Sequence, residues 1–473
     1  MSLLPLLVAV VALVLIGQLL QGDWRSALGL VLVIGFLQDP LRKVLVGQPP
    51  LTVGLVLVAA CGCGLAVLLQ RRGLELPLLQ ATLPAVGQWL PLYGVLLALQ
   101  TLHGLVRFGQ PLLSLIGVGV YLAPLLGLWL GFEVASEPPL LQRLLRFYVL
   151  LSIPAGLSVW WSYRGVDHPL LKEVGSGILI HFQPGVSLYG ASGVWRTSEV
   201  AAWQLAAAAC LALVLATAAR RRSTVWAYGL LAVLFTALTL LTGRRKAQVL
   251  VLLFVLFDAL LLQRWLRPPW RGWLLGNLVA LAGLSTLAVG WLVPQLLGAD
   301  LAVYLQRSLS SRDELGGRFS QMALGGFSRA LDLSGLFGFG VGAAAQTGNL
   351  LFDRGQQLGS SLAFVSESGA GKLVAELGLV GVAVLLVGLV LLLELGRRNL
   401  TLLQDLDPAL VHLHLGLVAF ALANVPFFLA ASGIYGDPFV LLLLSLALGS
   451  VLAVPLLVAR ARGLQLPSRT DAA

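Results

Sequence analysis

Apolar runs recur along nearly the whole chain, and short polar segments separate each run from the next. Each run is close to the ~20 residues that a helix needs to cross a bilayer. The pattern predicts about 13 transmembrane spans, with 12 or 14 also compatible. They fall near residues 3–20, 26–38, 51–69, 83–101, 110–130, 146–164, 199–219, 226–242, 247–263, 273–297, 373–395, 411–431 and 437–459. The second is short enough to be re-entrant. We therefore expect an all-α membrane protein with about 12–13 transmembrane helices in a single polytopic domain, residues 1–473.

Two connections between the runs are long, whereas the others are short. The first covers residues 164–198 and the second residues 298–372. Binding and catalytic residues concentrate in long loops, so these two are the first places to look for a site. Within the second, apolar residues recur every three or four positions, which predicts an amphipathic helix on or near the membrane face. These residues are Phe319, Met322, Ala323, Phe327, Ala330 and Leu331, and the segment starts with Arg312 and Arg318.

The composition excludes a large soluble domain. Of 473 residues, 58% are hydrophobic and 11% charged, and the mean hydropathy is +0.92. Soluble domains carry about 25% charged residues, and no polar segment here is long enough to form one. Cys61, Cys63 and Cys210 lie inside apolar runs, so we expect packing residues rather than disulfides or metal ligands. The first run lacks a basic leading segment and a clear cleavage site, which predicts a retained span rather than a signal peptide.

The formal net charge of +10 bears on the orientation of the spans. In a soluble protein it would suggest nucleic acid. In so apolar a chain it indicates basic loops on the cytoplasmic side, so we expect a lipid bilayer and no nucleic acid as partner. The basic turns contain Arg220, Arg221 and Arg222; Arg264, Arg267 and Arg271; Arg397 and Arg398; and Arg460 and Arg462. If these turns are cytoplasmic, the spans alternate consistently and both long loops face outside.

The sequence TGRRK at residues 242–246, here the TGRRK turn, then also lies outside, against the positive-inside rule. In one interpretation Arg244, Arg245 and Lys246 reach to lipid headgroups, as basic residues at span ends usually do. In the other they form an anion site at the outer membrane surface, because a misplaced cation cluster needs a compensating partner. A lipid-linked diphosphate is an anion held at that depth. The turn by itself does not decide between the two.

The N-terminal third does not resolve in the same way. Arg42 and Lys43 would prefer the cytoplasm, yet counting the spans back from the C-terminus places them outside. A re-entrant second segment would reconcile them with the rule, and the topology of this third stays open.

Arg196 occupies a second position suited to an anion. In the segment GVWRTSEVAAW it stands just before a span, where Thr197 or Ser198 is suited to cap the helix. A helix N-terminus and an arginine both favour phosphate. The alternative is an ordinary interfacial anchor, with Trp195 and Trp203 in the aromatic belt of the membrane.

The segment GLFGFGVGAAA carries three alternating glycines, Gly338, Gly340 and Gly342. The spacing resembles part of a dinucleotide-binding loop, but the strand–helix–strand unit that such a loop requires is not predicted around it. We expect a flexible turn with exposed backbone N–H groups.

Several residues that often bind metals are better explained otherwise. Asp405 and Asp407 follow a basic turn on the predicted cytoplasmic side and indicate a solvated loop. His412 and His414 are two apart, so on a helix they point to different faces and make a poor metal pair. His181 lies in the first long loop, where a structural role is expected. The sequence therefore predicts no metal site.

The order of these motifs resembles the O-antigen ligase/polymerase family of bacterial membrane glycosyltransferases. An arginine before a central span, a T-G-x-R turn, a long loop with arginine, a G-x-G-x-G segment and a closing ELGLVG follow one another over about residues 191–395. The resemblance implies a multi-span glycosyltransferase-like bundle in the bacterial plasma (inner) membrane, with its active site facing the periplasm. It also implies inverting transfer of glycan from an undecaprenyl diphosphate carrier to an acceptor hydroxyl, without metal or other cofactor.

The resemblance assigns roles to single residues. Arg245 matches the family's T-G-S-R arginine, with Arg244 in place of the serine. Arg318 matches the loop arginine, and Arg196 matches the arginine ahead of the central span. Their implied role is to bind and neutralise the diphosphate, which is also the leaving group. Arg244 and Arg312 complete the expected diphosphate-binding set.

One departure from the family decides the preferred function. Ligases acting on lipid A core carry a histidine just ahead of the ELG segment, whereas this chain reads SESGAGKLVAELG, with Glu367 and no histidine. Glu367 could act as general base if its surroundings raised its pKa. We therefore favour a polymerase that joins undecaprenyl-diphosphate-linked oligosaccharides into exopolysaccharide or O-antigen, working on a growing polysaccharide acceptor, beside a chain-length regulator.

Two alternatives stay open. One is an O-antigen ligase that transfers glycan to lipid A core or protein. The other is a transporter or flippase, a class that usually shows internal repeats and polar, broken helices in matching halves. We find no such repeat, and Asp258 is the main acidic residue inside a predicted span.

Overall fold

A computed structural model of the chain describes residues 11–12, 24–71, 84–174, 179–183, 186–265, 303–304, 307, 315–344, 365, 367–430 and 432–463. Within these ranges, ten helices are long and apolar enough to cross a membrane. The protein is therefore a multi-span helical membrane protein, as predicted. The predicted spans at 3–20 and 273–297 lie outside the described residues, apart from residues 11–12.

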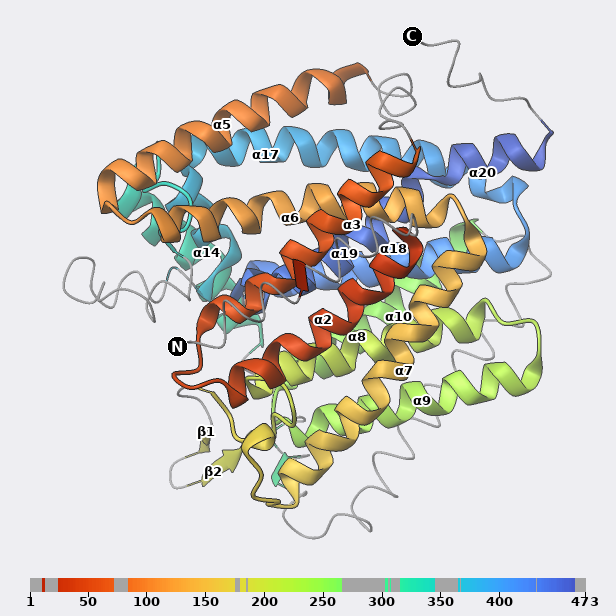
Figure 1. The fold of residues 1–473 in the computed structure, drawn as a ribbon, viewed down its shortest axis with the longest axis horizontal. Helices are drawn as coiled ribbons and strands as arrows, with labels where there is room; N and C mark the ends of the chain where they lie inside the picture. The colour runs from red at the N-terminus through yellow and green to blue at the C-terminus, as the bar shows by residue number, and fades with distance from the viewer. Residues whose placement is uncertain are drawn as a thin grey trace.

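The bundle contains a helix for nearly every predicted span, with α19 and α20 together corresponding to the span predicted at 437–459 (Figure 1). These helices are α2 (Trp24–Val44), α3 (Leu55–Arg71), α5 (Pro84–Phe108), α6 (Pro111–Ala135), α7 (Pro138–Tyr163), α8 (Ser198–Thr217), α9 (Arg222–Leu241), α10 (Arg245–Trp265), α17 (Gly369–Leu402), α18 (Pro408–Ala430), α19 (Pro438–Leu452) and α20 (Val454–Ala461). The 3-10 helices are η1 (Pro50–Gly54), η2 (Pro169–Leu171), η5 (Leu403–Asp405) and η6 (Ser432–Gly436). Helix starts follow the usual capping chemistry: Thr197 caps α8, Ser368 caps α17 and Asp437 caps α19.

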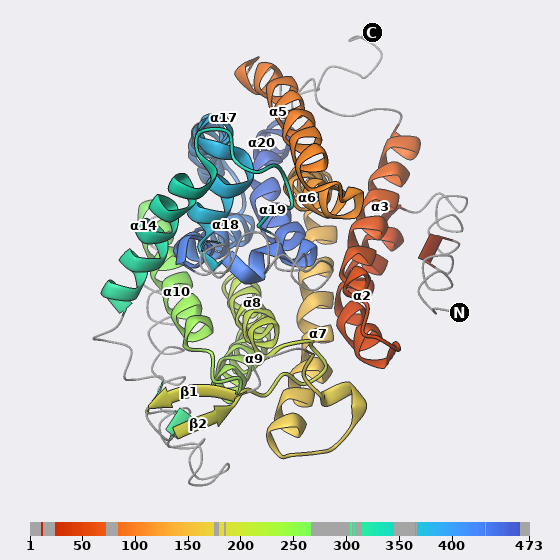
Figure 2. The same ribbon diagram turned by 90° about the vertical axis from the view of Figure 1, so that its left-hand side faces the viewer.

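The bundle has two ends, which we name after residues found there. At the Arg220 end, Arg220 pairs with Asp407, and Arg462 Nη2 lies 2.6 Å from Asp405 Oδ2. At the Arg196 end, which Figure 2 faces, lie the TGRRK turn, the 164–198 connection and α14 (Leu315–Ser334). The TGRRK turn and the Arg220 turn therefore lie at opposite ends, as the alternation of spans predicted.

The second predicted span forms the continuous helix α2, which is not among the ten helices long and apolar enough to cross a membrane, so its re-entrant course stays a prediction. Near its start, Arg25 Nη2 lies 2.6 Å from Glu137 Oε1, beside the first turn of α7 at the Arg220 end. Near its C-terminus, Asp39 contacts Arg196. Arg42 and Lys43 therefore lie at the Arg196 end, which settles their position within the fold.

Helix α8 forms the centre of the bundle. Its apolar window is 100% buried, and α7, α9, α10 and α18 surround it (Figure 2). Seven of its positions from Ala201 to Ala212 are alanine, and small side chains let neighbouring helices approach closely. The residue that precedes this helix, Arg196 with its cap Thr197, is consequently held at a fixed place at one end of the core.

The predicted amphipathic helix is confirmed as α14. Ala323 and Ala330 are buried, and Phe327 and Leu331 pack with the cluster that includes Val374 and Ala375 of α17. Leu324, on another face, is 70% exposed. The three- and four-residue spacing therefore marks the face that covers α17.

The glycine segment after α14 is not the flexible turn with exposed N–H groups that the sequence predicts. Gly338 to Ala344 are buried, and their backbone groups are bonded: Phe339 N donates to Ala375 O at 2.7 Å, and Val341 N to Gln100 O at 3.2 Å. Gly340 has φ +96°, and a Cβ there would lie 2.3 Å from Gly104 N. The glycines are required by close backbone approach to α5 and α17.

The glycine segment packs against the ELG segment of α17. Glu376 accepts hydrogen bonds from Ala344 N at 3.0 Å and from Tyr121 Oη at 2.7 Å. Gly378 has φ +68°, and a Cβ there would lie 2.2 Å from Leu336 O. The G-x-G-x-G and ELG motifs are therefore in direct contact with each other in the fold.

The 164–198 connection contains a two-stranded antiparallel hairpin that the sequence did not predict. Strand β1 (Leu179–Gln183) pairs with β2 (Val186–Tyr189), and His181 lies opposite Ser187 in the register. The all-α classification holds, because this hairpin is small and lies at one end of the bundle (Figure 1).

Candidate functional site

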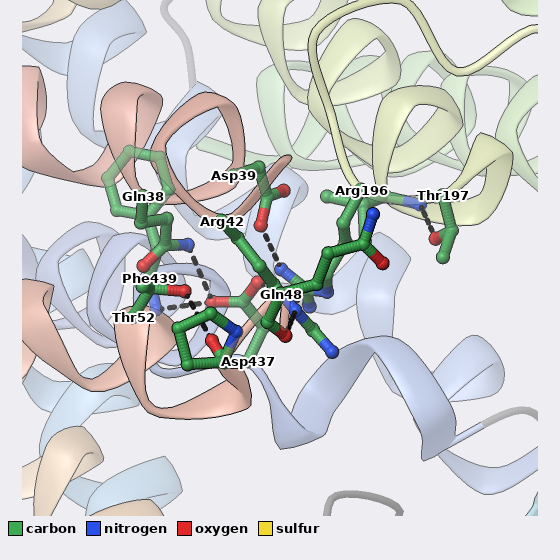
Figure 3. A network of polar contacts seen from close by, with 11 residues as sticks. Gln38, Asp39, Arg42, Gln48, Thr52, Arg196, Thr197, Asp437 and Phe439 are labelled. Carbon is green, nitrogen blue, oxygen red and sulfur yellow. Dashed lines mark hydrogen bonds and ion pairs between the residues drawn. The ribbon is translucent and has the colours of Figure 1, made fainter. Parts of the chain in front are cut away.

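Arg196 lies between two buried carboxylates (Figure 3). Its Nη1 is 2.8 Å from Asp39 Oδ1, and its Nη2 is 2.8 Å from Asp437 Oδ2. The side chain of Arg196 is 14% exposed, and those of Asp39 and Asp437 are 2% and 0% exposed. Burial alone would lower the pKa of Arg196, but the two carboxylates outweigh burial and raise this pKa above its ordinary value.

This ion network ties three helices together at the Arg196 end. Asp39 belongs to α2, and Asp437 caps α19 by accepting from Phe439 N at 2.8 Å. Gln38 Nε2 also donates to Asp437 Oδ1, at 3.4 Å. Because Arg196 directly precedes α8, the network holds the N-terminal end of this central helix against α2 and α19. Sequence reasoning found Arg196 but neither partner, because Asp39 and Asp437 lie 157 and 241 residues away in the chain.

Lys43 and Arg42 are held by backbone carbonyls beside this network. Lys43 Nζ donates to Gly193 O at 2.7 Å and to Leu170 O at 3.1 Å. Arg42 Nε donates to Gln48 O at 3.1 Å. Lys43 therefore fastens the 164–198 connection to α2, and both cations serve in holding chain segments at this end.

The TGRRK turn is shaped by its threonine and glycine. Thr242 is fully buried and its Oγ1 accepts from Arg244 N at 3.3 Å. Gly243 has φ +66°, a conformation that residues with a Cβ rarely adopt, and it ends α9 so that α10 can start at Arg245. The T-G pair thus places two arginines and a lysine in sequence at the N-terminus of α10, where the helix dipole also favours an anion.

The side chains of the turn point to the start of α8. Arg244 Nε donates to Ser198 Oγ at 3.1 Å, and Lys246 Nζ lies 3.6 Å from Glu199 Oε1. Arg245 is half-buried. A small pocket is lined by Arg244 and Lys246 together with Trp203 and Tyr435. Two of the three cations of the turn, Arg244 and Lys246, thus line one small hollow at the Arg196 end.

Both long connections converge on the TGRRK turn. From the first, a Cβ on Gly243 would lie 2.9 Å from Ile180 Cδ1 of β1, and Ala191 N donates to Leu241 O at 3.2 Å. From the second, Arg307 Nε donates to Gly243 O at 3.1 Å. Tyr304 Oη joins the two connections by donating to Tyr189 O at 2.6 Å. Arg307 therefore adds a cation to the turn that the sequence had not singled out.

Glu173 is an acidic residue of the site that sequence reasoning missed. Its Oε1 accepts from Ser198 N at 2.9 Å, which caps α8, while its Oε2 is buried without a hydrogen-bond partner among the described residues. Burial raises the pKa of Glu173, and the Ser198 hydrogen bonds and Arg244 only partly offset this. A carboxyl of raised pKa that interacts with the cations Arg244 and Lys43 is a candidate functional group. Its sequence context, LLKEVGSG, gives no signal of this position.

Of the other predicted site residues, only Glu367 has a described side chain. Arg318 lies in the first turns of α14, and its side chain is not described; Arg312 lies outside the described residues. Glu367 stands just before the cap of α17 and is exposed. The burial that would activate Glu367 is therefore absent. The predicted diphosphate roles of Arg312 and Arg318 stay predictions.

The residues interpreted as unrelated to metal binding lie in a loop or inside a helix. Asp405 and Asp407 pair with Arg462 and Arg220 in the loop at the Arg220 end, as expected for a solvated loop. His412 is 3% exposed and is buried within α18. Over the described ranges, no group of three or more His, Cys, Asp or Glu side chains could hold a metal ion.

Comparison with protein-family models and with curated proteins finds no match to this chain. The site must therefore be interpreted from its own geometry and from the order of its motifs.

Proposed function

We propose that this protein is a glycosyltransferase that joins undecaprenyl-diphosphate-linked oligosaccharides into a polysaccharide at the outer face of the bacterial plasma membrane. The observation that supports this best is the grouping of Arg244, Arg245, Lys246 and Arg307 where both long connections meet. A cluster of cations at a helix N-terminus, at one end of an apolar bundle, suits an anionic headgroup held at the membrane surface.

The orientation follows from the positive-inside rule. Short connections at the Arg220 end carry Arg220, Arg221 and Arg222; Arg397 and Arg398 lie near the C-terminus of α17, and Arg460 lies in the last turn of α20. This end is expected to be cytoplasmic. The TGRRK turn at the opposite end would then face the periplasm, where a polymerase meets its lipid-linked substrates.

In the proposed reaction, a hydroxyl oxygen of the acceptor sugar attacks the anomeric carbon of the donor glycan. The new C–O bond forms as the bond from the anomeric carbon to the diphosphate oxygen breaks, with inversion. The hydroxyl proton passes to a carboxylate, and the bonding pair leaves with the diphosphate. Arg245, with Arg244 beside it, stabilises that charge, which is commonly the largest catalytic contribution. Arg196, already paired with two carboxylates, is a positioning residue.

The purified protein supplied only with lipid-linked repeat units tests this function. A polymerase lengthens them and releases polyprenyl diphosphate. A ligase would leave them unchanged until lipid A core or an acceptor protein is added. Movement of the repeat units across proteoliposomes, with no new glycosidic bond under either condition, would identify a transporter and exclude the proposal.

The orientation makes a separate prediction. Lys172→Cys at the Arg196 end, where Lys172 is 65% exposed, should react with a membrane-impermeant maleimide in cells whose outer membrane alone is permeabilised. Arg397→Cys, 66% exposed at the opposite end, should react only after the inner membrane is opened. Labelling is read by mass shift, with the wild-type cysteines as background. The reverse pattern would place the TGRRK turn in the cytoplasm and exclude the proposed site.

The general base is expected to be Glu173 or Glu367, and a pH profile separates them. A base acts when ionised, so the rate of polymerisation should fall as pH drops through its pKa. Because the pKa of Glu173 is raised, a limb due to Glu173 would lie above the ordinary range of glutamate. Glu173→Gln, which keeps an oxygen to cap α8, should remove that limb and most of the rate. If Glu367→Gln removes it instead, Glu173 has only a capping role.

A further inference from the structure

A long apolar groove runs along the outside of the bundle between α5, α6, α17 and α19. Its volume is about 640 Å³, within the roughly 300–1,000 Å³ typical of ligand pockets. Its walls are almost entirely apolar and aromatic, with Trp89 and Tyr93 of α5 stacked on one side. Leu389 of α17 lines it and is 49% exposed, so the groove opens to the side of the bundle.

The groove follows much of α17 but has a charged group at one end only. On α17 it is lined by Lys372 and Leu373 before the kink at Gly378 and by residues from Leu385 to Leu395 after it. Lys372 lies at the Arg196 end, and Leu395 lies toward the Arg220 end. Of the described residues that line the groove, Lys372 alone carries a formal charge. This course and this polarity match a lipid chain with an anionic headgroup.

Lys372 is the cation at one end of the groove. The residue as a whole is 8% exposed and lines the groove, and no carboxylate pairs with it among the described residues. Glu376, one turn further along α17, is engaged by Tyr121 and by Ala344 N instead. A lysine at the mouth of an otherwise apolar groove favours an anionic group there over a neutral one.

A thin partition separates this groove from the pocket beside the TGRRK turn. Phe428 lines the groove and its neighbour Phe427 lines the pocket, while Tyr435 lines both. Tyr435 Oη is fixed by Asn424, at 2.9 Å from Oδ1. Two anion-binding positions, Lys372 and the TGRRK turn, therefore lie on the two sides of the end of α18 and η6.

We propose that the groove holds the hydrocarbon chain of a second polyprenyl-diphosphate-linked glycan, the acceptor, with Lys372 binding its diphosphate. This inference rests on the proposed function, because a polymerase joins two lipid-linked glycans and needs a binding site for each. The donor diphosphate occupies the TGRRK turn, and the acceptor lies across the partition. The two glycans then extend from the same end of the bundle toward one another.

The test counts bound lipids without any glycan or turnover. The full-length protein, in nanodiscs of zwitterionic phospholipid, is titrated with polyprenyl diphosphate and analysed by native mass spectrometry. The wild type should bind two copies. Lys372→Met should weaken one of them roughly 10- to 100-fold, the effect of losing a charge-assisted hydrogen bond. Leu389→Trp, which fills the groove, should remove the same copy, whereas Arg245→Gln should weaken the other.

Matched controls keep the result specific. Lys172→Met removes an exposed lysine from the same end, and Leu386→Trp adds the same bulk to an exposed position of α17 outside the groove. Both should still bind two copies. The inference is overturned if Lys372→Met binds like the wild type, or if phosphatidylglycerol displaces the groove copy as well as polyprenyl diphosphate does. Loss of that copy in Lys372→Met, without chain lengthening by the wild type, would keep the lipid site and reject the proposed function with its acceptor role.

Discussion

Arg245→Gln is expected to lower the rate of polymerisation roughly 100- to 1,000-fold, the usual cost of removing one group that stabilises developing negative charge. Arg245 is the first residue of α10 and is half-buried in the TGRRK turn, so its guanidinium and the helix N-terminus act on the same anion. The rate is measured as lengthening of lipid-linked repeats by purified protein. A loss in kcat larger than any change in KM would assign the effect to the departing diphosphate.

Lys172→Gln is the matched control for this prediction. Lys172 is 65% exposed at the same end and its Nζ lies 2.9 Å from Asp167 Oδ1, so its loss should change the rate little. The retained fold is checked by elution as a single species and an unchanged unfolding transition. Full-length polymer from folded Arg245→Gln at normal expression would contradict the proposed site.

Arg196→Leu is expected to lower the free energy of unfolding by about 3–5 kcal/mol, because it leaves two buried carboxylates without their cation. Asp39 and Asp437 are 1% exposed as whole residues, so water cannot replace the guanidinium. Equilibrium unfolding in mixed micelles measures the change. Arg397→Leu breaks an exposed pair with Glu394 and should cost at most about 1 kcal/mol.

A triple variant separates the positioning role of Arg196 from direct diphosphate binding. When Arg196→Leu is combined with Asp39→Asn and Asp437→Asn, no charge remains in the network, and the side-chain oxygen kept by Asp437→Asn can still cap α19. If Arg196 only positions α2, α8 and α19, stability and polymerisation should both recover in part. If stability recovers while activity stays absent, Arg196 binds the diphosphate itself.

The sequence predicted the helices well because a span must be both long and apolar, and both properties can be counted. Ten candidate spans match predicted runs, and α14 presents the predicted face to α17. The failures have a common cause. The predicted span at 26–38 is shorter than α2, because α2 continues through Asp39, Arg42 and Lys43, and these polar residues are compensated by partners elsewhere in the chain.

The glycine segment shows the same limit. Alternating glycines indicate a backbone that must adopt unusual dihedral angles or approach another chain closely, but they do not say which. Gly340 does both, against Gly104 of α5, and the segment is therefore buried rather than flexible. Glu173 and Lys372 were likewise unremarkable in the sequence, because burial of a charged side chain depends on neighbours that are far away in the chain.

By itself, the sequence determined that this is a multi-span helical membrane protein, and that the TGRRK turn lies at the end opposite to the other basic turns. These follow from local hydropathy and from counting spans. Only the tertiary structure decided which cations are compensated. Arg196 is held by Asp39 and Asp437, whereas Lys372 stands at the mouth of an apolar groove with no such partner among the described residues. The reason is physical: the state of a charge in a low-dielectric interior depends on the groups within a few ångströms, and helix packing brings those groups together from distant parts of the chain.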